Sequence, residues 1–332
     1  MRVLKFGGSS LADAEAIAHV ARLVGEYAEP LETVLVCSAC AGVTNQLAQI
    51  IELLREGCGI RALAKVRALR ARHRTILFSL KLGAEPSSER ARVWNELEEL
   101  GAGLRASVAG TARRDAGAAW ADSVLAYGEC ASARIAAGAL RSGGLRAEAI
   151  DATRFLATDA NFQNAAPMRE ETRNRGRKLL LPLIEQGVVP VVTGFIGATL
   201  AGETTTLGRN SSDFSAAIVG DVLDADEVWL WTDVDGIYDG DPRGRAGLQQ
   251  ERPPDEGLTL LEELTYDEAL HLANRGAKVL HPRTIEPLRE KNIVLRVRNT
   301  FRPEHPGTRI CGENMRPAAD SSAPFAEESA AQ

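Results

Sequence analysis

The sequence predicts an α/β fold, because segments that read as strands and helices alternate from the N-terminus onward. Residues 3–6, VLKF, read as a buried strand, and Ser10 then starts a helix with Asp13 as its capping-box partner. Residues 33–37, TVLVC, read as a second strand, which a loop and a helix to about Glu56 follow. Strand, loop and helix in repeated order are typical of an α/β sheet.

The rest of the chain continues this alternation after a long helical stretch. Residues 60–142 are rich in Ala, Leu, Arg and Glu and are expected to be helical throughout. A second capping box, Thr265 with Glu268, predicts a helix that runs through Ala273. Strand-like runs occur at residues 145–150, 188–195, 204–207, 227–231 and 292–299. Pro190 lies in one of these runs and is expected to weaken or end its first half, since proline cannot donate a ladder hydrogen bond.

Composition and charge indicate a globular protein rather than a nucleic-acid or membrane protein. The chain has 332 residues, 45% hydrophobic and 25% charged, enough for one large domain or two medium ones. Its net charge of −6 argues against a nucleic-acid surface, and no apolar run reaches the ~18 residues of a membrane span. No apolar signal core is seen, so a cytoplasmic location is expected. Residues 313–332 are expected to form a disordered tail or a linker.

Cysteine usage does not indicate a disulfide framework, since five cysteines are spread over the whole chain. Cys37 and Cys40 form a C-x-x-C pair, a weak redox or metal motif without a second pair or a nearby histidine. We favour the interpretation that two small residues flank a tight loop.

Two loops rich in small residues follow the first two strands. KFGGSS places Lys5 at a strand end and Gly7 and Gly8 before a helix, where backbone N–H groups can approach an anion. An ordinary β–α turn explains the same residues equally well. SACAGVTN offers the hydroxyls of Ser38 and Thr44, although Thr44 is also expected to be a helix N-cap.

Polar side chains also gather after the threonine-rich strand, in the stretch ETTTLGRNSSDF. Arg209 offers a planar fork that matches a carboxylate, and Asp213 is an anion in the first turn of the next helix. A surface ion pair with an N-cap serine would explain Asp213 but not Arg209. Open α/β sheets bind ligands at strand ends, so we expect a ligand site here.

Two further motifs lie toward the C-terminus. WTDVDGIYDGDPR carries Asp233, Asp235 and Asp241, which are either calcium ligands or part of a nucleotide-contacting loop. Their spacing does not fit an EF-hand. In GAKVLHPRT, His281 stands beside a proline and is expected to be structural rather than catalytic, since no matching nucleophile and base accompany it.

Taken together, these motifs resemble those of the aspartate kinases, of the amino-acid kinase superfamily. KFGGSS, SAxxxxTN, GE at 128–129, LGRNSSD, WTDVDGIYxxDPR and GAKVLHPRT occur in the family's order, over residues 1 to about 312. The forms KFGGSSLAD and LGRN look most like the kinase halves of bifunctional aspartate kinase–homoserine dehydrogenases. The resemblance implies a three-layer α/β/α sandwich around a mainly parallel sheet. It also implies a substrate lobe, about 1–200, and a nucleotide lobe, about 201–312.

The activity that the resemblance implies is ATP-dependent phosphorylation of the aspartate β-carboxylate. The product is 4-phospho-L-aspartate, which enters lysine, threonine and methionine synthesis. A carboxylate with a pKa of about 4 is already ionised at neutral pH, so the nucleophile needs no general base. Catalysis then consists of positioning and of neutralising charge between two anions. Mg²⁺ is expected to arrive bound to the phosphates of ATP and to keep several waters.

Site residues carry over from the family motif by motif. The implied catalytic residues are Lys5, which stabilises the transferring phosphoryl group, and Asp213, which orients Lys5. The residues implied for substrate binding are Ser38, Thr44, Glu129, Arg209 and Ser212. The residues implied for ATP binding are Lys5, Gly7, Gly8, Ser9, Thr232, Asp233, Tyr238, Arg243 and Lys278.

Each substrate group has an implied partner. Arg209 would clamp the α-carboxylate, Glu129 would pair with the ammonium, and Thr44, with Ser38 nearby, would hold the side-chain carboxylate. Ser212 stands beside Asp213 at the same helix start. No metal is implied to be held by protein ligands alone.

Two features depart from the family pattern. Ser211 stands where the family usually has glycine, and serine would be strained there if the position needs a positive φ. Family members continue into paired regulatory ACT domains, often followed by a dehydrogenase, where this sequence has its polar tail. We therefore expect no feedback inhibition by lysine or threonine, whether the chain is a stand-alone enzyme or a piece of a fusion.

Two alternatives stay open on the sequence alone. The same fold could phosphorylate another carboxylate, such as that of glutamate, an N-acyl amino acid or a specialised metabolite, although Arg209 and Glu129 together favour a free amino acid. A catalytically weakened binding or regulatory subunit is supported by Ser211 and by the missing regulatory domains. The family analogy predicts a homodimer that binds a small-molecule substrate. Net charge and hydropathy predict that it binds neither nucleic acid nor membrane.

Overall fold

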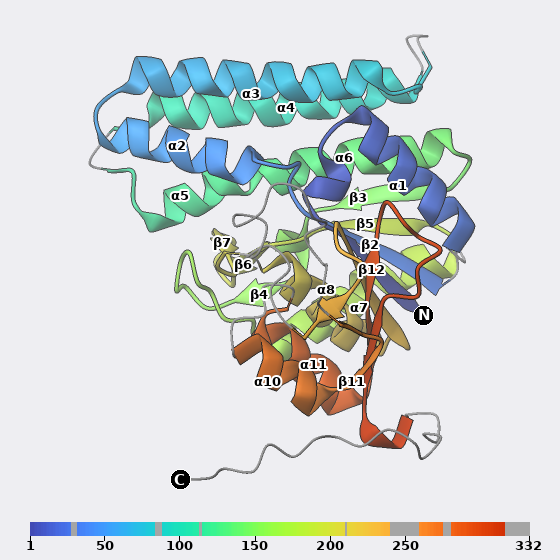
Figure 1. Cartoon of the computed structure of the whole chain (residues 1–332). Helices are drawn as coiled ribbons and strands as arrows, with labels where there is room; N and C mark the ends of the chain where they lie inside the picture. The colour runs from blue at the N-terminus through green and yellow to red at the C-terminus, as the bar shows by residue number, and fades with distance from the viewer. Residues whose placement is uncertain are drawn as a thin grey trace, which may run out of the picture.

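A computed structural model shows a chain built around one large β-sheet (Figure 1). The structure describes residues 1–27, 32–83, 88–112, 115–209, 211–239, 259–274 and 280–315. Among these residues, eight strands form the central sheet in the order β11-β13-β12-β8-β1-β2-β5-β3. Neighbouring strands in it run parallel except β12 and β13, so the prediction of a mainly parallel sheet is confirmed.

Strand β1 lies near the middle of this sheet, with β8 on one side and β2 on the other. The strands of the central sheet are β1 (Arg2–Phe6), β2 (Thr33–Cys37), β3 (Ala147–Ile150), β5 (Val189–Thr193), β8 (Glu227–Thr232), β11 (Glu263–Thr265), β12 (Val294–Asn299) and β13 (Thr308–Cys311). A smaller sheet and a short pair are formed by β4 (Ala157–Thr158), β6 (Ile196–Thr199) and β7 (Thr204–Thr206), and by β9 (Ile237–Tyr238) with β10 (Leu260–Leu261).

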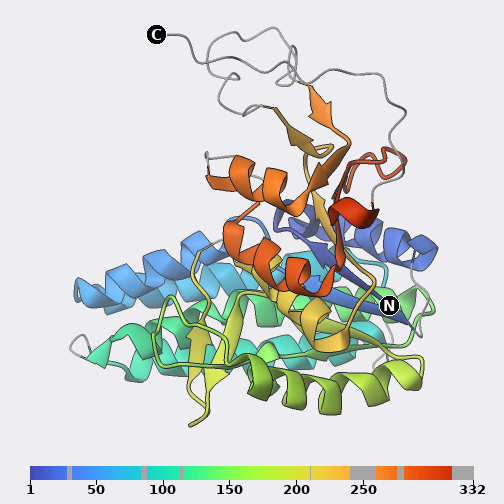
Figure 2. The ribbon, with the colours of Figure 1, turned by 90° about the horizontal axis from the view of Figure 1, so that it is seen from below.

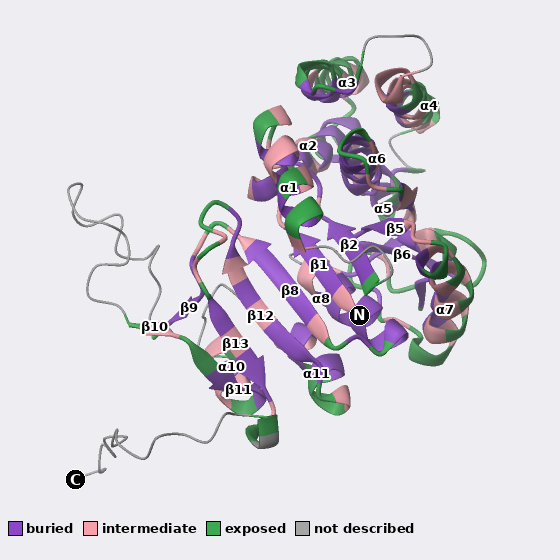
Figure 3. Cartoon of the chain, turned by 90° about the vertical axis from the view of Figure 1, so that its right-hand side faces the viewer, coloured by how far each residue is buried: buried purple, intermediate pink, exposed green. Residues whose placement is uncertain are grey.

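Helices cover both faces of the central sheet (Figures 1 and 3). In the part of the chain that the structure describes, the helices are α1 (Ala14–Tyr27), α2 (Val43–Arg55), α3 (Gly59–Ser79), α4 (Glu89–Gly110), α5 (Ala118–Leu125), α6 (Tyr127–Ser142), α7 (Arg169–Glu185), α8 (Ser212–Leu223), α10 (Tyr266–Asn274) and α11 (Pro282–Lys291). One face packs against α1 and α6, with the α3–α4 hairpin beyond them, and the other packs against α7 and α8. The predicted three-layer α/β/α sandwich is confirmed.

The two helical layers cover opposite faces of the central sheet. Figure 2 shows the molecule from the α10–α11 side. Side chains of a strand alternate between faces, so Leu4 and Phe6 of β1 join the core beneath α1 and α6. Val3 joins the core beneath α8 instead. In the part of the chain that the structure describes, no helix is both long and apolar enough to cross a membrane.

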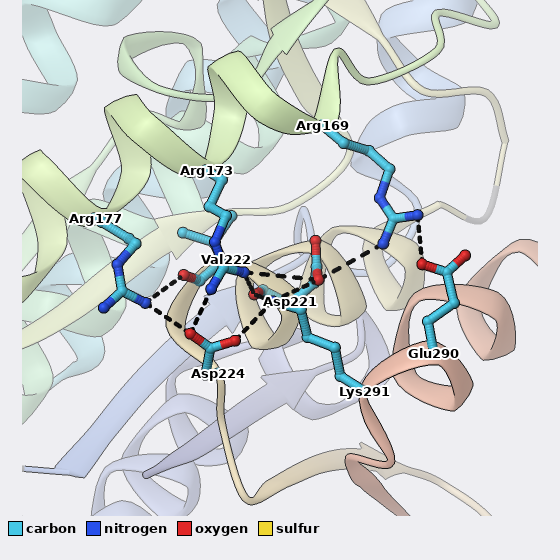
Figure 4. A network of polar contacts seen from close by, with 8 residues as sticks. All are labelled: Arg169, Arg173, Arg177, Asp221, Val222, Asp224, Glu290 and Lys291. Atoms are coloured by element: carbon cyan, nitrogen blue, oxygen red, sulfur yellow. Dashed lines mark hydrogen bonds and ion pairs between the residues drawn. The ribbon is translucent and has the colours of Figure 1, made fainter.

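Helix α8 is buried along its length and is held at its C-terminal end by cations (Figure 4). Lys291 of α11 donates hydrogen bonds to the Asp221 carbonyl and to Asp224 Oδ1, both at 2.6 Å. Arg173 of α7 donates to the same Asp221 carbonyl at 2.7 Å. The last carbonyls of a helix lack partners within it and carry partial negative charge, so these cations stabilise the end of α8. This fixes the helix between its two neighbours.

The first helix begins later than the sequence predicts. A 3-10 turn, Ser9–Leu11, comes first, and α1 follows Asp13, whose Oδ1 accepts a hydrogen bond from the Ala16 N–H at 3.0 Å. Ser10 is buried, and its Oγ lies 2.7 Å from Thr300 Oγ1. The predicted capping box of Ser10 and Asp13 is therefore wrong, because Asp13 itself caps the helix.

Pro190 neither ends nor weakens its strand, which corrects a second prediction. It lies inside β5, between β2 and the edge strand β3, and opposite Glu148. The ladder between β5 and β2 begins only at Val191, opposite Leu35. The missing N–H of the proline therefore falls outside that ladder.

The other elements follow the sequence more closely. Helices α3 to α6 fill the stretch expected to be helical, and the second capping box is confirmed because the Glu268 N–H donates to Thr265 Oγ1 at 3.1 Å. Helix α7 and strands β4, β6, β9, β10, β11 and β13 were not predicted, and residues Glu313–Met315 of the expected tail form a 3-10 turn. Residues 316–332 lie outside the described residues.

Candidate active site

Lys5 and Asp213 form an ion pair at the carboxyl end of the central strand. Lys5 lies on the same face of β1 as Val3, which is the face that α8 covers. Asp213 lies in the first turn of α8, and its Oδ1 is 2.6 Å from Lys5 Nζ. The helix dipole stabilises a carboxylate at this position, and the carboxylate in turn neutralises a lysine that is only 8% exposed. The structure thus brings together the two residues predicted to be catalytic.

The glycine loop after β1 packs closely against the loop after β2. The Gly8 carbonyl accepts a hydrogen bond from the Ala41 N–H at 3.0 Å. A Cβ on Gly8 would lie 2.9 Å from the Ala39 carbonyl oxygen, so no larger residue fits without a shift of backbone. Gly7 lies beside the ammonium, since a Cβ there would be 3.5 Å from Lys5 Nζ. The backbone of the glycine loop therefore passes close to the Lys5 ammonium, an arrangement that suits an anion such as phosphate.

Glu129 is a buried carboxylate with one partnered and one unpartnered oxygen. It lies in the first turn of α6, is 3% exposed, and accepts a hydrogen bond on Oε1 from the Ala39 N–H at 3.2 Å. Its Oε2 has no hydrogen-bond partner among the described residues. Burial raises the pKa of this carboxyl from its ordinary value of 4.5 to about 8, and the Ala39 hydrogen bond opposes the rise. Such a group favours a cationic partner.

The other predicted loop residues lie around the same strand ends. Ser38 follows β2 directly, and its carbonyl accepts a hydrogen bond from Ser132 Oγ at 2.6 Å. Thr44 lies in the first turn of α2, and both it and Ser38 are half-buried. The N-cap of α2 is Gly42 with a φ of 77°, so the expectation that Thr44 caps the helix is wrong. Ser9 begins the 3-10 turn after the glycine loop.

The turn between β7 and α8 presents Arg209 to solvent. Gly208 has a φ of 95°, a conformation that glycine adopts without strain. Arg209 is exposed, and no hydrogen bond or ion pair of its side chain is found within the described residues. Ser211 has a φ of −93° and donates from Oγ to the Gly208 carbonyl at 2.6 Å, so the expected strain at Ser211 is absent. Ser212 begins α8.

The residues predicted to hold the nucleotide are described only in part. Thr232 ends β8, and its Oγ1 donates to Asp233 Oδ1 at 3.2 Å. Tyr238 is buried in β9, opposite Leu260 of β10. Two further predicted residues, Arg243 and Lys278, lie outside the described residues.

The calcium interpretation of the aspartate-rich loop is not supported. Asp235 is buried and accepts hydrogen bonds on Oδ1 from Asn299 Nδ2 at 2.7 Å and from Arg302 Nε at 2.9 Å. It thus ties its loop to the end of β12 and is not available as a metal ligand. Asp241 lies outside the described residues, and within those ranges no group of three or more ligating side chains could hold a metal ion.

Two weaker motifs have structural explanations. His281 is the N-cap of α11, and its Nδ1 accepts a hydrogen bond from the Arg283 N–H at 3.2 Å, which confirms the structural interpretation. Cys37 and Cys40 are buried, and burial raises the pKa of both thiols to about 12. Both thiols therefore stay protonated at neutral pH and are poor nucleophiles or metal ligands.

Two polar residues near the site were missed by the sequence reasoning. Arg283, within the motif GAKVLHPRT, donates to the Leu207 carbonyl at 3.0 Å. Asp122 is fully buried in α5 and accepts hydrogen bonds from the N–H groups of Gln163 and Thr206, both at 2.8 Å. An arginine directly after a proline at a helix start was a usable signal for the first. Asp122 stands in an alanine-rich helical run with no such signal.

Comparison with known proteins places these motifs in one family. The model of the amino acid kinase family matches residues 1–299. Aspartokinase 3, chloroplastic, of Arabidopsis thaliana is 35% identical over 93% of this chain and 52% of its own length. Bifunctional aspartokinase/homoserine dehydrogenase 2 of Escherichia coli is 35% identical over 92% of this chain and 35% of its own length. The chain thus spans about half, or less, of the length of these relatives.

Solved structures agree with the sequence comparison. The crystal structure of E. coli aspartokinase III in complex with aspartate and ADP superposes with a TM-score of 0.78 at 31% identity. The match covers 94% of this chain and 64% of that one. Because the family model matches most of the sequence and a solved aspartokinase shares the fold, this chain belongs to the amino acid kinase family.

Proposed function

We propose that this chain is the catalytic unit of an aspartate kinase, which converts ATP and L-aspartate to ADP and 4-phospho-L-aspartate. Its relatives are aspartokinases, and a structural relative was solved with aspartate and ADP. The observation that carries the proposal is the unpartnered Oε2 of buried Glu129, a group that favours an ammonium ion. It shares its neighbour, Ala39, with the glycine loop beside Lys5.

Recognition of the substrate follows from opposite charges on two elements. Glu129 would pair with the α-ammonium, and the exposed guanidinium of Arg209 would clamp the α-carboxylate through two parallel hydrogen bonds. An acylated nitrogen carries no charge and would leave Glu129 without a cation. The half-buried hydroxyls of Ser38 and Thr44 would then hold the side-chain carboxylate. These roles favour a free α-amino acid with a carboxylate side chain.

The chemical step needs charge neutralisation rather than a base. A β-carboxylate oxygen attacks the γ-phosphorus of ATP, the bond from that phosphorus to the bridging oxygen breaks, and ADP leaves with the electron pair. Lys5 would neutralise the phosphoryl oxygens, while Asp213 holds its ammonium in place. The N–H groups around Gly7 and Gly8 would bind phosphate oxygens. Mg²⁺ enters with the substrate, as the Mg-ATP complex.

Several finer predictions belong to this proposal. A homodimer, a cytoplasmic location and insensitivity to lysine and threonine stay predictions, as does the division into two lobes. The alternative of a weakened subunit loses one of its arguments, since Ser211 sits in an ordinary backbone conformation. Glutamate as acceptor offers the same α-groups as aspartate, so it is tested beside aspartate.

The experiment that tests the proposal is a hydroxylamine trap for acyl phosphate. Purified protein is mixed with Mg-ATP and, separately, with aspartate, glutamate and N-acetylglutamate. We expect hydroxamate with aspartate and little with the other two. Asp213→Asn and Lys5→Met should each lower kcat on the order of 10²–10³-fold, the usual cost of one electrostatic group at a transition state.

A matched control is Asp267→Asn, which removes another aspartate from the first turn of a helix, α10. Its side chain is exposed and pairs with Arg289 at 2.9 Å, so kcat should stay unchanged. Hydroxamate with glutamate alone would support the proposed phosphoryl transfer but show that the acceptor is glutamate rather than aspartate. No hydroxamate from any acceptor, with folded protein that binds Mg-ADP, would refute the proposed activity.

A further inference from the structure

Arg283 contacts the turn that carries Arg209, although the two residues are far apart in the sequence. Its Nη1 donates to the Leu207 carbonyl at 3.0 Å and to Asn164 Oδ1 at 3.2 Å. Its Nη2 donates to the Ala165 carbonyl at 3.3 Å. Leu207 is the residue just before Gly208 and Arg209, so one guanidinium holds the chain at the entry to this turn.

The same guanidinium also packs on the helix that carries Asp213. It stacks over the Phe214 ring, 4.5 Å from the ring centroid. Phe214 follows Asp213 directly in the first turn of α8. Arg283 therefore contacts the segments on both sides of the turn, the strand end before Arg209 and the helix start after it.

The position of Arg283 in its own helix is unfavourable by itself. It lies in the first turn of α11, where the helix dipole favours anions and disfavours a cation. It forms no ion pair within the ranges that the structure describes; its partners are neutral oxygens and an aromatic ring. A planar fork that bonds two carbonyls and stacks on a ring is a geometry that arginine provides and lysine does not. These contacts, rather than helix propensity, explain why an arginine stands at this position.

We propose that Arg283 is a positioning residue, which fixes the turn that presents Arg209 to the substrate α-carboxylate and the first turn of α8 beside it. This inference rests on the proposed function. Arg283 acts through Arg209 and does not itself touch the substrate.

The proposal predicts a selective effect on aspartate. In Arg283→Met the turn loses its anchor, and the KM for aspartate should rise about tenfold or more, because small displacements of a positioning group have large kinetic costs. The KM for ATP should change less than threefold. Arg283→Lys keeps the positive charge but loses the planar fork and the stacking on Phe214. Its KM for aspartate should therefore lie between those of wild type and Arg283→Met. The side chain borders a hollow of about 250 Å³ between α7, α8 and α11, so a methionine can be accommodated without overpacking.

The matched control is Arg289→Met, on the same helix. Arg289 is about half exposed and pairs only with Asp267 among the described residues, so both KM values should stay within twofold of wild type. A double variant, Arg209→Ala with Arg283→Met, separates positioning from a general structural effect. If Arg283 acts through Arg209, the double variant should have the aspartate KM of Arg209→Ala alone. Multiplied effects in the double variant, or an unchanged aspartate KM in Arg283→Met, would overturn the inference.

A readout without catalysis distinguishes failure of this inference from failure of the proposed function. Hydrogen exchange of peptides covering residues 203–209 is compared in wild type, Arg283→Met and Arg289→Met. We expect faster exchange in Arg283→Met alone, whether or not the wild type phosphorylates aspartate. Equal exchange in the three proteins would contradict the positioning role even if the enzyme is an active aspartate kinase.

Discussion

At the scale of single residues, burial sets the chemistry of Glu129. Its carboxyl is 3% exposed, and the Ala39 N–H is its one hydrogen-bond donor from another residue in the described chain. Burial of an unpaired carboxylate destabilises the ionised form, which is why the pKa is raised to about 8. Under the proposed function, this carboxyl would exchange its proton for the α-ammonium of aspartate.

The first prediction concerns pH and folding stability. Because the folded pKa of Glu129 is raised from 4.5 to about 8, the folded chain binds more protons than the unfolded chain between these two values. This residue should therefore lower stability as pH rises through that window, by up to about 1.4 kcal/mol per pH unit. Urea unfolding of wild type and Glu129→Gln between pH 5 and about pH 8 measures the difference.

In Glu129→Gln the pH-dependent loss from this group is absent, so the stability of the variant relative to wild type should increase toward pH 8. Ser132→Ala, one turn further along α6, serves as the control and should leave the shape of the pH profile unchanged. A constant stability difference between wild type and Glu129→Gln across the window would show that Glu129 titrates normally.

At the scale of elements, α8 carries a predicted catalytic residue at one end and is fixed by cations at the other. Its N-terminal turn carries Asp213, paired with Lys5, and its C-terminal end is surrounded by cations from α7 and α11 (Figure 4). Charges of opposite sign at the two ends both match the helix dipole. The position of Asp213 therefore depends on contacts a whole helix length away.

The second prediction tests this C-terminal cluster. Lys291→Met removes an ammonium that lies 2.9 Å from Asp221 Oδ1 and donates to the Asp221 carbonyl. The exposed fraction of the Asp221 side chain is 9%, so the loss leaves a nearly buried carboxylate less neutralised. We expect a loss of about 1–3 kcal/mol in the free energy of unfolding.

Lys178→Met is the control, since Lys178 is exposed on α7, and its effect should stay within about 0.5 kcal/mol. Chemical denaturation of both variants measures the difference. Equal stabilities for the two lysine variants would mean that Arg173 and its neighbours satisfy the end of α8 without Lys291.

Local signals in the sequence identified most helices and strands, because caps and hydrophobic patterns depend on residues that are close in the chain. The capping box of Thr265 and Glu268 was found correctly, since both partners lie within one turn. The similar box of Ser10 and Asp13 was wrong because a distant residue, Thr300, binds the Ser10 hydroxyl instead. Pro190 was misjudged for a related reason, since the register with β2 decides which N–H groups are needed.

In the site, too, motifs predicted individual residues, but contacts between residues far apart in the sequence were not predicted. Strand-end patterns drew attention to Lys5 and Asp213, whereas Glu129 was predicted only through the family resemblance. What no pattern contains is that Arg283 contacts Asn164, which lies 119 residues away, or that Asp122 contacts Thr206. Ser211 was judged by analogy, whereas its φ of −93° is set by the turn in this chain.

At the scale of the whole molecule, the predicted binding residues come from widely separated parts of the chain. Lys5 follows the chain start, Glu129 lies in α6, and Arg209 precedes α8. Ligands that contact all of them would add further links between these segments. Bound ligands should therefore stabilise the fold as a whole.

The third prediction follows from this linkage. Mg-ADP and L-aspartate, each at about 100 times its dissociation constant, should each stabilise the folded chain by about 2.7 kcal/mol. Thermal unfolding in the presence of each ligand, and of both, measures the shift in midpoint. Succinate, which lacks the α-ammonium, should give little or no shift. A shift from succinate equal to that from aspartate would contradict the role of Glu129.

The place of β1 in the sheet has a consequence for synthesis of the protein on the ribosome. Residues Arg2–Phe6 pair on one side with Thr33–Cys37, which emerge soon afterwards, and on the other side with β8, whose residues begin only at Glu227. Until then one edge of the nascent strand is open, and open strand edges recruit other chains. Slow translation before residue 227, or a nascent chain released early, should therefore favour aggregation, and a chaperone that shields this edge should raise the yield.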